Sequence, residues 1–190
     1  MTPYETACGA IDRANSADPR REDGSPREVL YSRWMVDWAR RLAPGASEEL
    51  LLAARAQHVC RWTVPRSTYP EGRAGYLRWR EDLKKFHAGE AAGILEAAGY
   101  DAASIGKVRT ILLRKNLAAD PEGQTLEDAA CLVFLERELA PFAGKTDEAK
   151  VVDILRKTWG KMSPRARGLA QGLSYGPREA ALLAKALGAG

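Results

Sequence analysis

Apolar side chains recur every three or four residues along most of the chain, which is the spacing of an amphipathic α-helix. One such stripe consists of Leu30, Trp34, Trp38 and Leu42. No stretch alternates apolar with polar residues in the way a half-buried β-strand does. The pattern therefore predicts an all-α fold. The predicted helices run from about Pro3 to Ala14, Pro26 to Leu42, Ser47 to just before Pro65, Arg73 to Gly99 with breaks at Gly89 and Gly93, Asp101 or Ser104 to Leu112, Thr125 to Leu139, Thr146 to Trp159, Ser163 to Leu173 and Pro177 to Leu187.

The domain organisation follows from the evenness of this pattern. The longest predicted loop is polar and covers residues 15–25. It is too short to act as a linker, and no repeat or low-complexity segment divides the chain. We therefore expect one compact helical domain over residues 1–190, large enough to bury a full core.

Composition and charge narrow the class of protein. Of the 190 residues, 45% are hydrophobic and 28% are charged, and the net charge is +4. This composition is globular, and so mild a positive charge without a basic tail does not favour a nucleic-acid partner. No run approaches the roughly 20 apolar residues of a membrane helix, so we expect no membrane association.

The number and spacing of the cysteines indicate the redox environment of the protein in the cell. Cys8, Cys60 and Cys131 are odd in number, widely spaced and without a Cys-x-x-Cys pair. That usage is typical of free thiols in a reducing environment and does not suggest a structural zinc site. The sequence, which also begins without an evident signal peptide, predicts a cytoplasmic protein.

Charged residues interrupt the apolar faces of two predicted helices. Arg55, His58 and Trp62 share a face of the third helix, with Arg61 on the neighbouring face. Buried arginine requires a partner, because desolvating an unpaired charge is costly. The pattern leaves two interpretations open, either internal pairing with Asp or Glu or a polar pocket within the core.

The fourth predicted helix repeats this feature. Arg73, Arg80 and His87 are seven residues apart along the stripe that contains Tyr76, and Arg66 precedes them in a loop. Arginine suits forked recognition of phosphate or carboxylate. Together with Arg55 and Arg61, these residues predict a binding site for a small anionic ligand. The alternative is a structural network of ion pairs.

Asp128 is the third unusual residue, because it shares a helical face with Leu132, Leu135 and Leu139 and should point inward. Buried carboxylates are paired or bound to metal. A first-turn aspartate also has an ordinary function as a helix cap. The pattern leaves both interpretations of Asp128 open.

Several long phrases resemble one family over nearly the whole chain. They include Ala53-Ala-Arg-Ala-Gln-His-Val-Cys-Arg-Trp, Val64-Pro-Arg-Ser-Thr-Tyr-Pro and Leu126-Glu-Asp-Ala-Ala-Cys-Leu-Val-Phe-Leu-Glu. On these phrases the chain is similar to the uncharacterised family called domain of unknown function 4202 (DUF4202). That resemblance implies no activity.

A more distant resemblance is to the HD-domain metal-dependent phosphohydrolases, which are all-α. Ala53 to Arg61 is similar to their Ala-Ala-Leu-Leu-His-Asp-Ile-Gly-Lys motif, with Gln57 at the His position and His58 at the Asp position. Their first histidine would fall near Tyr31 or Ser32, and their closing Asp corresponds to Asp128. The resemblance implies an HD-like helical bundle with an altered ligand set.

Two functions follow from this resemblance, and the residues leave the choice open. In the first, His58, His87 and Asp128 hold a divalent Fe, Mn or Zn ion or act as an acid–base group, and the protein is an enzyme for a small phosphate or carboxylate compound, such as a metal-dependent phosphohydrolase. In the second, the protein is a non-catalytic sensor of a small anion. Association with RNA is a third and less favoured interpretation. The sequence leaves the ligand and the oligomeric state undetermined.

Overall fold

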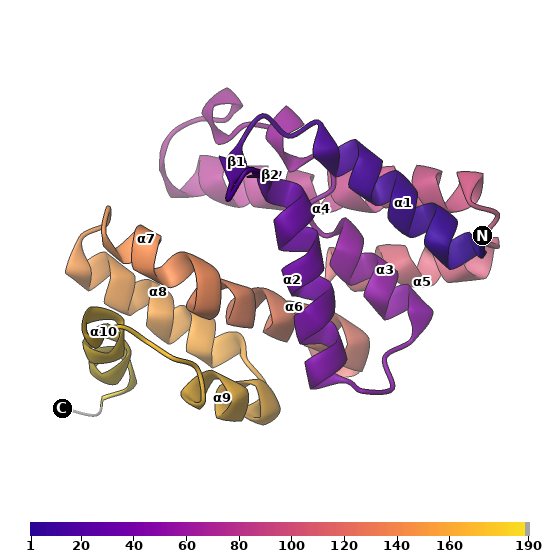
Figure 1. Cartoon of the computed structure of the whole chain (residues 1–190). Helices are drawn as coiled ribbons and strands as arrows, with labels where there is room; N and C mark the ends of the chain where they lie inside the picture. Colours follow the sequence, from indigo (N-terminus) through magenta and orange to yellow (C-terminus); the bar gives the residue numbers. More distant parts are fainter. Residues whose placement is uncertain (189–190) are drawn as a thin grey trace. The chain divides into compact units, whose positions relative to one another are not determined.

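The computed structural model describes residues 1–188 and confirms the all-α fold (Figure 1). The chain divides into two compact units, Met1–Leu126 and the part that begins at Glu127. Helix α6 (Pro121–Val133) contributes its first residues to one unit and its remainder to the other. The expected single domain stays a prediction, since a division into compact units does not establish whether either unit folds alone.

The first unit is built around a short apolar helix. Helix α3 (Glu48–Ala56) contacts α1, α2, α4 and α5. Its Leu52, Ala53 and Ala54 are fully buried, which agrees with a central position in this unit. Ser47 starts α3 by accepting a hydrogen bond from the Leu50 N–H at 3.1 Å. The other elements of this unit are α1 (Pro3–Ser16), β1 (Arg21–Glu22), β2 (Ser25–Pro26), α2 (Arg27–Leu42), η1 (Arg61–Thr63), η2 (Arg66–Thr68), α4 (Gly72–Ala97), α5 (Ala102–Leu113) and η3 (Leu117–Ala119).

The second unit is a smaller group of helices with its own apolar core. Leu155 on α8 and Leu182 on α10 are buried there, and these two helices pack together. Asp147 and Ser163 cap the first turns of α8 and α9, and proline occupies the first turn of α9 and α10. After α6, the elements are a π-helical turn η4 (Phe134–Glu138), α7 (Leu139–Ala143), α8 (Glu148–Lys161), α9 (Pro164–Gln171) and α10 (Pro177–Leu187).

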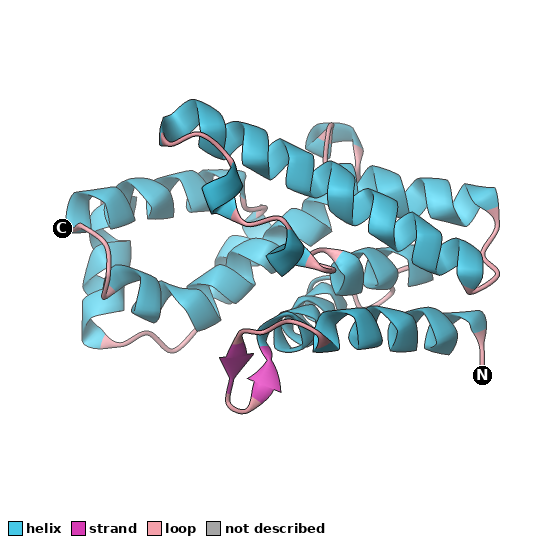
Figure 2. Cartoon of the chain, turned by 90° about the horizontal axis from the view of Figure 1, so that it is seen from above, coloured by secondary structure: helices cyan, strands magenta, loops and turns pink. Residues whose placement is uncertain are grey.

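A small hairpin lies within the predicted polar loop, where no strand was expected. Strands β1 and β2 pair antiparallel and are joined by Asp23 and Gly24 (Figure 2). Both turn residues have positive φ, at 49° and 76°. Asp-Gly is the signature of the tight hairpin turn that needs this geometry, so the sequence did contain a local signal for the hairpin.

Helix boundaries differ from the sequence prediction at two places that matter for the site. Helix α3 ends at Ala56 and does not continue toward Pro65. Helix α4 runs unbroken through Gly89 and Gly93 to Ala97, because tertiary packing compensates for the low helix propensity of glycine. Within residues 1–188, no helix is both long enough and apolar enough to span a membrane.

Candidate functional site

The end of α3 projects His58 out of the helix. Cys60 adopts a left-handed conformation with φ 54°, which an α-helix does not accommodate. The Cys60 N–H donates to Oδ1 of buried Asn15 at 3.1 Å, and this bond holds the turn. His58 therefore lies in a turn between α3 and η1, and not on the helical face that it was predicted to share with Arg55.

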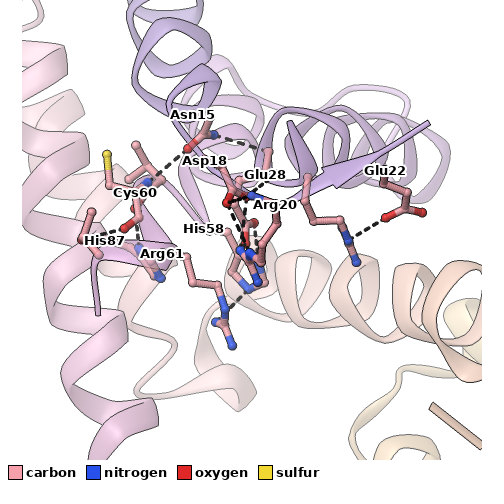
Figure 3. A network of polar contacts seen from close by, with 12 residues as sticks. Asn15, Asp18, Arg20, Glu22, Glu28, His58, Cys60, Arg61 and His87 are labelled. Atoms are coloured by element: carbon pink, nitrogen blue, oxygen red, sulfur yellow. Dashed lines mark hydrogen bonds and ion pairs between the residues drawn. The ribbon is translucent and has the colours of Figure 1, made fainter. Parts of the chain in front are cut away.

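Beside this turn lies a buried carboxylate network, formed by the loop before α2 and by the first turn of α2 (Figure 3). Asp18 is fully buried and accepts hydrogen bonds from the Arg20 N–H at 3.0 Å and the Glu28 N–H at 3.2 Å. The Arg20 guanidinium bonds both Asp18 and the Glu28 side chain. Two carboxylates that would be costly to bury alone therefore share one cation.

Glu28 connects this network to His58. Its Oε2 lies 3.2 Å from Nδ1 of His58, and the Arg61 guanidinium lies 3.2 Å from Nε2 of the same ring. Because a guanidinium can only donate, Nε2 of His58 is the acceptor and Nδ1 carries the proton that is donated to Glu28. Both nitrogens of His58 are therefore engaged, and the ring is neutral.

The charges around His58 keep the ring neutral. Burial lowers the pKa of His58 well below its ordinary value, and so do Arg61, Arg114, Arg27 and Arg20. We call His58 and these four arginines the His58 centre. These guanidinium groups act together with burial against a proton on His58.

Tyr31 on α2 supports the ring of His58. The two ring centroids are 3.9 Å apart and the rings are nearly parallel, at 10°. Nε2 of buried Gln57 donates to the Tyr31 hydroxyl at 3.2 Å. Tyr31 thus contacts both His58, through its ring, and Gln57, through its hydroxyl.

His87 on α4 lies beside this group, with its ring centroid 5.9 Å from that of His58. Its Nδ1 lies 2.9 Å from the Val59 carbonyl oxygen, so Nδ1–H donates there and Nε2 is the acceptor. Burial lowers the pKa of His87 to about 3, with further contributions from His58 and Arg61. His87 is therefore neutral at physiological pH.

Aromatic rings flank two of the arginines. The Arg61 guanidinium lies 4.9 Å from the ring of Trp79, and that of Arg27 lies 5.0 Å from the ring of Trp34. Arg27 also pairs with Glu22 at 2.7 Å. Such stacking holds a guanidinium plane in a fixed orientation, which is a requirement for forked recognition of an anion.

The other predicted anion-binding residues contact different parts of the first unit. Arg55 makes two hydrogen bonds to Asp12 on α1. Arg66 donates to the carbonyl groups of residues 69, 70 and 72 and so holds its own loop together. Arg73 and Tyr76 are exposed, and Arg80 lies 5.8 Å from the Tyr76 ring. Arg61 is the predicted anion-binding residue that the structure places against His58.

Asp128 belongs to the second unit. It is buried, as its helical position predicted, and its Oδ1 accepts a hydrogen bond from the Ser163 N–H at 2.9 Å. This contact fixes the start of α9. Its neighbour Glu127 lies 3.6 Å from the Lys161 ammonium. The catalytic assignment of Asp128 stays a prediction.

The residues fit a metal ion poorly. Within residues 1–188, no three His, Cys, Asp or Glu side chains are grouped so as to hold one. Both ring nitrogens of His58 are engaged, whereas Nε2 of His87 is without a partner among the described residues. The set His58, His87 and Asp128 stays a predicted metal site, and we derive no reaction step from it.

Sequence reasoning missed much of the His58 centre and of the carboxylate network beside it. Asp18, Arg20 and Glu28 were not singled out, because each has an ordinary local interpretation as a loop residue or a first-turn carboxylate. Arg27 and Arg114 were likewise not distinguished from surface arginines. Only the tertiary contacts mark these residues.

Comparison with known proteins supports one statement of identity. Residues 5–183 match the family described as "Domain of unknown function (DUF4202)", and the chain belongs to this family. No curated protein matches the chain. No solved structure matches it either.

Proposed function

We propose that this protein binds a small compound bearing a phosphate or carboxylate group at the His58 centre. The observation that carries the proposal is the placement of the Arg61 guanidinium, which lies 3.2 Å from Nε2 of neutral His58 and 4.9 Å from the centre of the Trp79 ring. Burial and the charges of nearby arginines also lower the pKa of His58, which agrees with a site that favours an anion over a proton. Guanidinium groups also match phosphate and carboxylate in geometry.

The contacts of Tyr31, Gln57 and His58 favour a binding module derived from an HD-like fold. In the HD-domain resemblance these positions correspond to metal ligands. Here the Gln57 amide donates to Tyr31, and both nitrogens of His58 serve Glu28 and Arg61. Side chains engaged in this way support a sensor of a small anion over a metal-dependent hydrolase.

The cysteines bear on the cellular location. Cys8, Cys60 and Cys131 are free thiols, which supports the proposed cytoplasmic location.

A hydrolase remains the second candidate, and the contact between Glu28 and His58 favours it. A carboxylate that orients an imidazole is one part of the arrangement that a general base requires, and Nε2 of His58 would complete it once the Arg61 guanidinium left that nitrogen for a bound anion. A divalent metal would supply polarisation of a phosphoryl oxygen or a more acidic bound water. The described donor atoms do not fit such an ion, so this candidate rests on His58 and Glu28.

Isothermal titration calorimetry with inorganic phosphate and with succinate, at constant ionic strength, tests the proposed function. We expect saturable binding of at least one anion, weakened about tenfold in Arg61→Gln because one charged hydrogen-bonding group is lost. Arg109→Gln is the matched control, since Arg109 is exposed on α5. The absence of binding for both anions, or equal binding by the two variants, would contradict the proposal.

Turnover separates the two candidates. A sensor binds phosphate without hydrolysing p-nitrophenyl phosphate, with or without added Mn²⁺, Fe²⁺ or Zn²⁺. Hydrolysis that is lost in both His58→Gln and Glu28→Gln, but kept in Arg109→Gln, would establish the hydrolase instead.

A further inference from the structure

Two buried acceptors beside the His58 centre have no hydrogen-bond donor among residues 1–188. They are Nε2 of His87 and Oε1 of Gln57. Each residue is only 4% exposed, so neither acceptor has ready access to bulk water. Buried acceptors in proteins nearly always have a partner, and leaving one without a donor is costly.

Both acceptors belong to residues close to His58. His87 lies 5.9 Å from His58, centroid to centroid. Gln57 directly precedes His58 and bonds the hydroxyl of Tyr31, whose ring stacks on His58. A group bound against the His58 centre therefore has these two acceptors for neighbours.

The charges nearby decide what kind of donor suits them. His87 presents Nε2 as an acceptor, because its Nδ1–H donates to the Val59 carbonyl oxygen at 2.9 Å. The Arg61 guanidinium lies close by, 3.2 Å from Nε2 of His58. The same positive charge disfavours an ammonium group or a metal ion, whereas a neutral hydroxyl donates without that repulsion.

We propose that the ligand of the His58 centre carries at least one hydroxyl group in addition to its anionic group, and that His87 Nε2 and Gln57 Oε1 accept from it. The inference rests on the proposed function and narrows the ligand class to hydroxylated phosphates or hydroxycarboxylates. The arginines contact the anionic group, while the two acceptors select for the hydroxyl.

Matched pairs of probes test the inference in the unmodified protein by calorimetry. Glycerol 3-phosphate is compared with propyl phosphate, and malate with succinate, because the members of each pair differ chiefly in hydroxyl groups. We expect the hydroxylated member of at least one pair to bind roughly tenfold more tightly, as satisfaction of a buried acceptor implies. Equal affinities within both pairs would overturn the inference and leave the proposed function standing. Failure of all four probes, and of inorganic phosphate, would overturn both.

Two variants assign the preference to its residues. His87→Phe and Gln57→Met replace the acceptors with apolar groups. In at least one of them the preference for the hydroxylated probe should fall to near parity, with the affinity for its unhydroxylated partner kept. A preference retained in both variants would overturn the assignment, and Arg109→Gln serves as the control that keeps the full preference. Since the wild-type comparison needs no variant, poor folding of either variant leaves the test decisive.

Discussion

The imidazole of His58 lies flat against the phenol ring of Tyr31, with 3.9 Å between centroids and 10° between ring planes. One residue comes from α2 and the other from the turn after α3. The stack fixes the plane of His58, so that Nδ1 faces Glu28 and Nε2 faces Arg61. Tyr31 therefore positions His58 through its ring and holds Gln57 through its hydroxyl.

These two contributions of Tyr31 can be separated. Tyr31→Phe keeps the stack and loses the bond to Gln57, so we expect it to lower the free energy of unfolding by about 1 kcal/mol. Tyr31→Ala also removes a buried ring and should cost about 3–5 kcal/mol. Urea unfolding measures both. Similar costs for the two variants would show that the ring contributes little.

Glu28 should be far more important to stability than another glutamate paired with arginine nearby. Glu28 is buried and serves Arg20 and His58, so Glu28→Gln should cost about 3 kcal/mol. Glu22→Gln breaks a pair whose carboxylate is 39% exposed and should cost at most about 1 kcal/mol. Chemical unfolding of the two variants under the same conditions checks the contrast. Equal losses would mean that the network around Glu28 is not cooperative.

Arg55 is expected to act in stability and not in ligand binding. Its bonds to Asp12 join α3 to α1, and both side chains are partly buried. A double-mutant cycle with Arg55→Gln and Asp12→Asn should give a coupling of about 1 kcal/mol. Binding of inorganic phosphate should stay unchanged in Arg55→Gln. If Arg55→Gln bound phosphate more weakly and Asp12→Asn bound it as the wild type does, Arg55 would have to be assigned to the anion-binding site.

The buried histidines predict a loss of stability in mild acid. The unfolded chain protonates His87 near the ordinary pKa of 6.5, whereas the folded protein does so only at about 3. Between these two values the unfolded state therefore binds more protons than the folded state. The contribution of His87 to the free energy of unfolding is fully present above the ordinary pKa and is lost as the pH falls toward 3. The expected slope from His87 is about 1 kcal/mol per pH unit between about pH 6 and about pH 4. The free energy of unfolding of His87→Gln should fall less steeply with decreasing pH than that of the wild type, by about that amount. Equal slopes for the two proteins would contradict the assignment of this pH dependence to His87.

Many features that depend on near neighbours were predictable from the sequence. The apolar stripe of α2 and the helix starts at Ser47 and Ser163 depend on residues three or four apart, so periodicity and helix-start signals predicted them. The burial of Asp128 followed from the same periodicity. The Asp23-Gly24 hairpin was also locally encoded, although the helical pattern around it concealed the signal.

Only the tertiary structure decided the composition of the site. His58 leaves its helix because Cys60 adopts a left-handed conformation, held by Asn15 from 45 positions earlier in the chain. Glu28 reaches His58 across 30 positions, and His87 reaches Val59 across 28. Periodicity carries no information about such distant pairs. They form because the buried carboxylates and histidines must find partners once the apolar faces have excluded water, and which partners they find depends on how the helices pack.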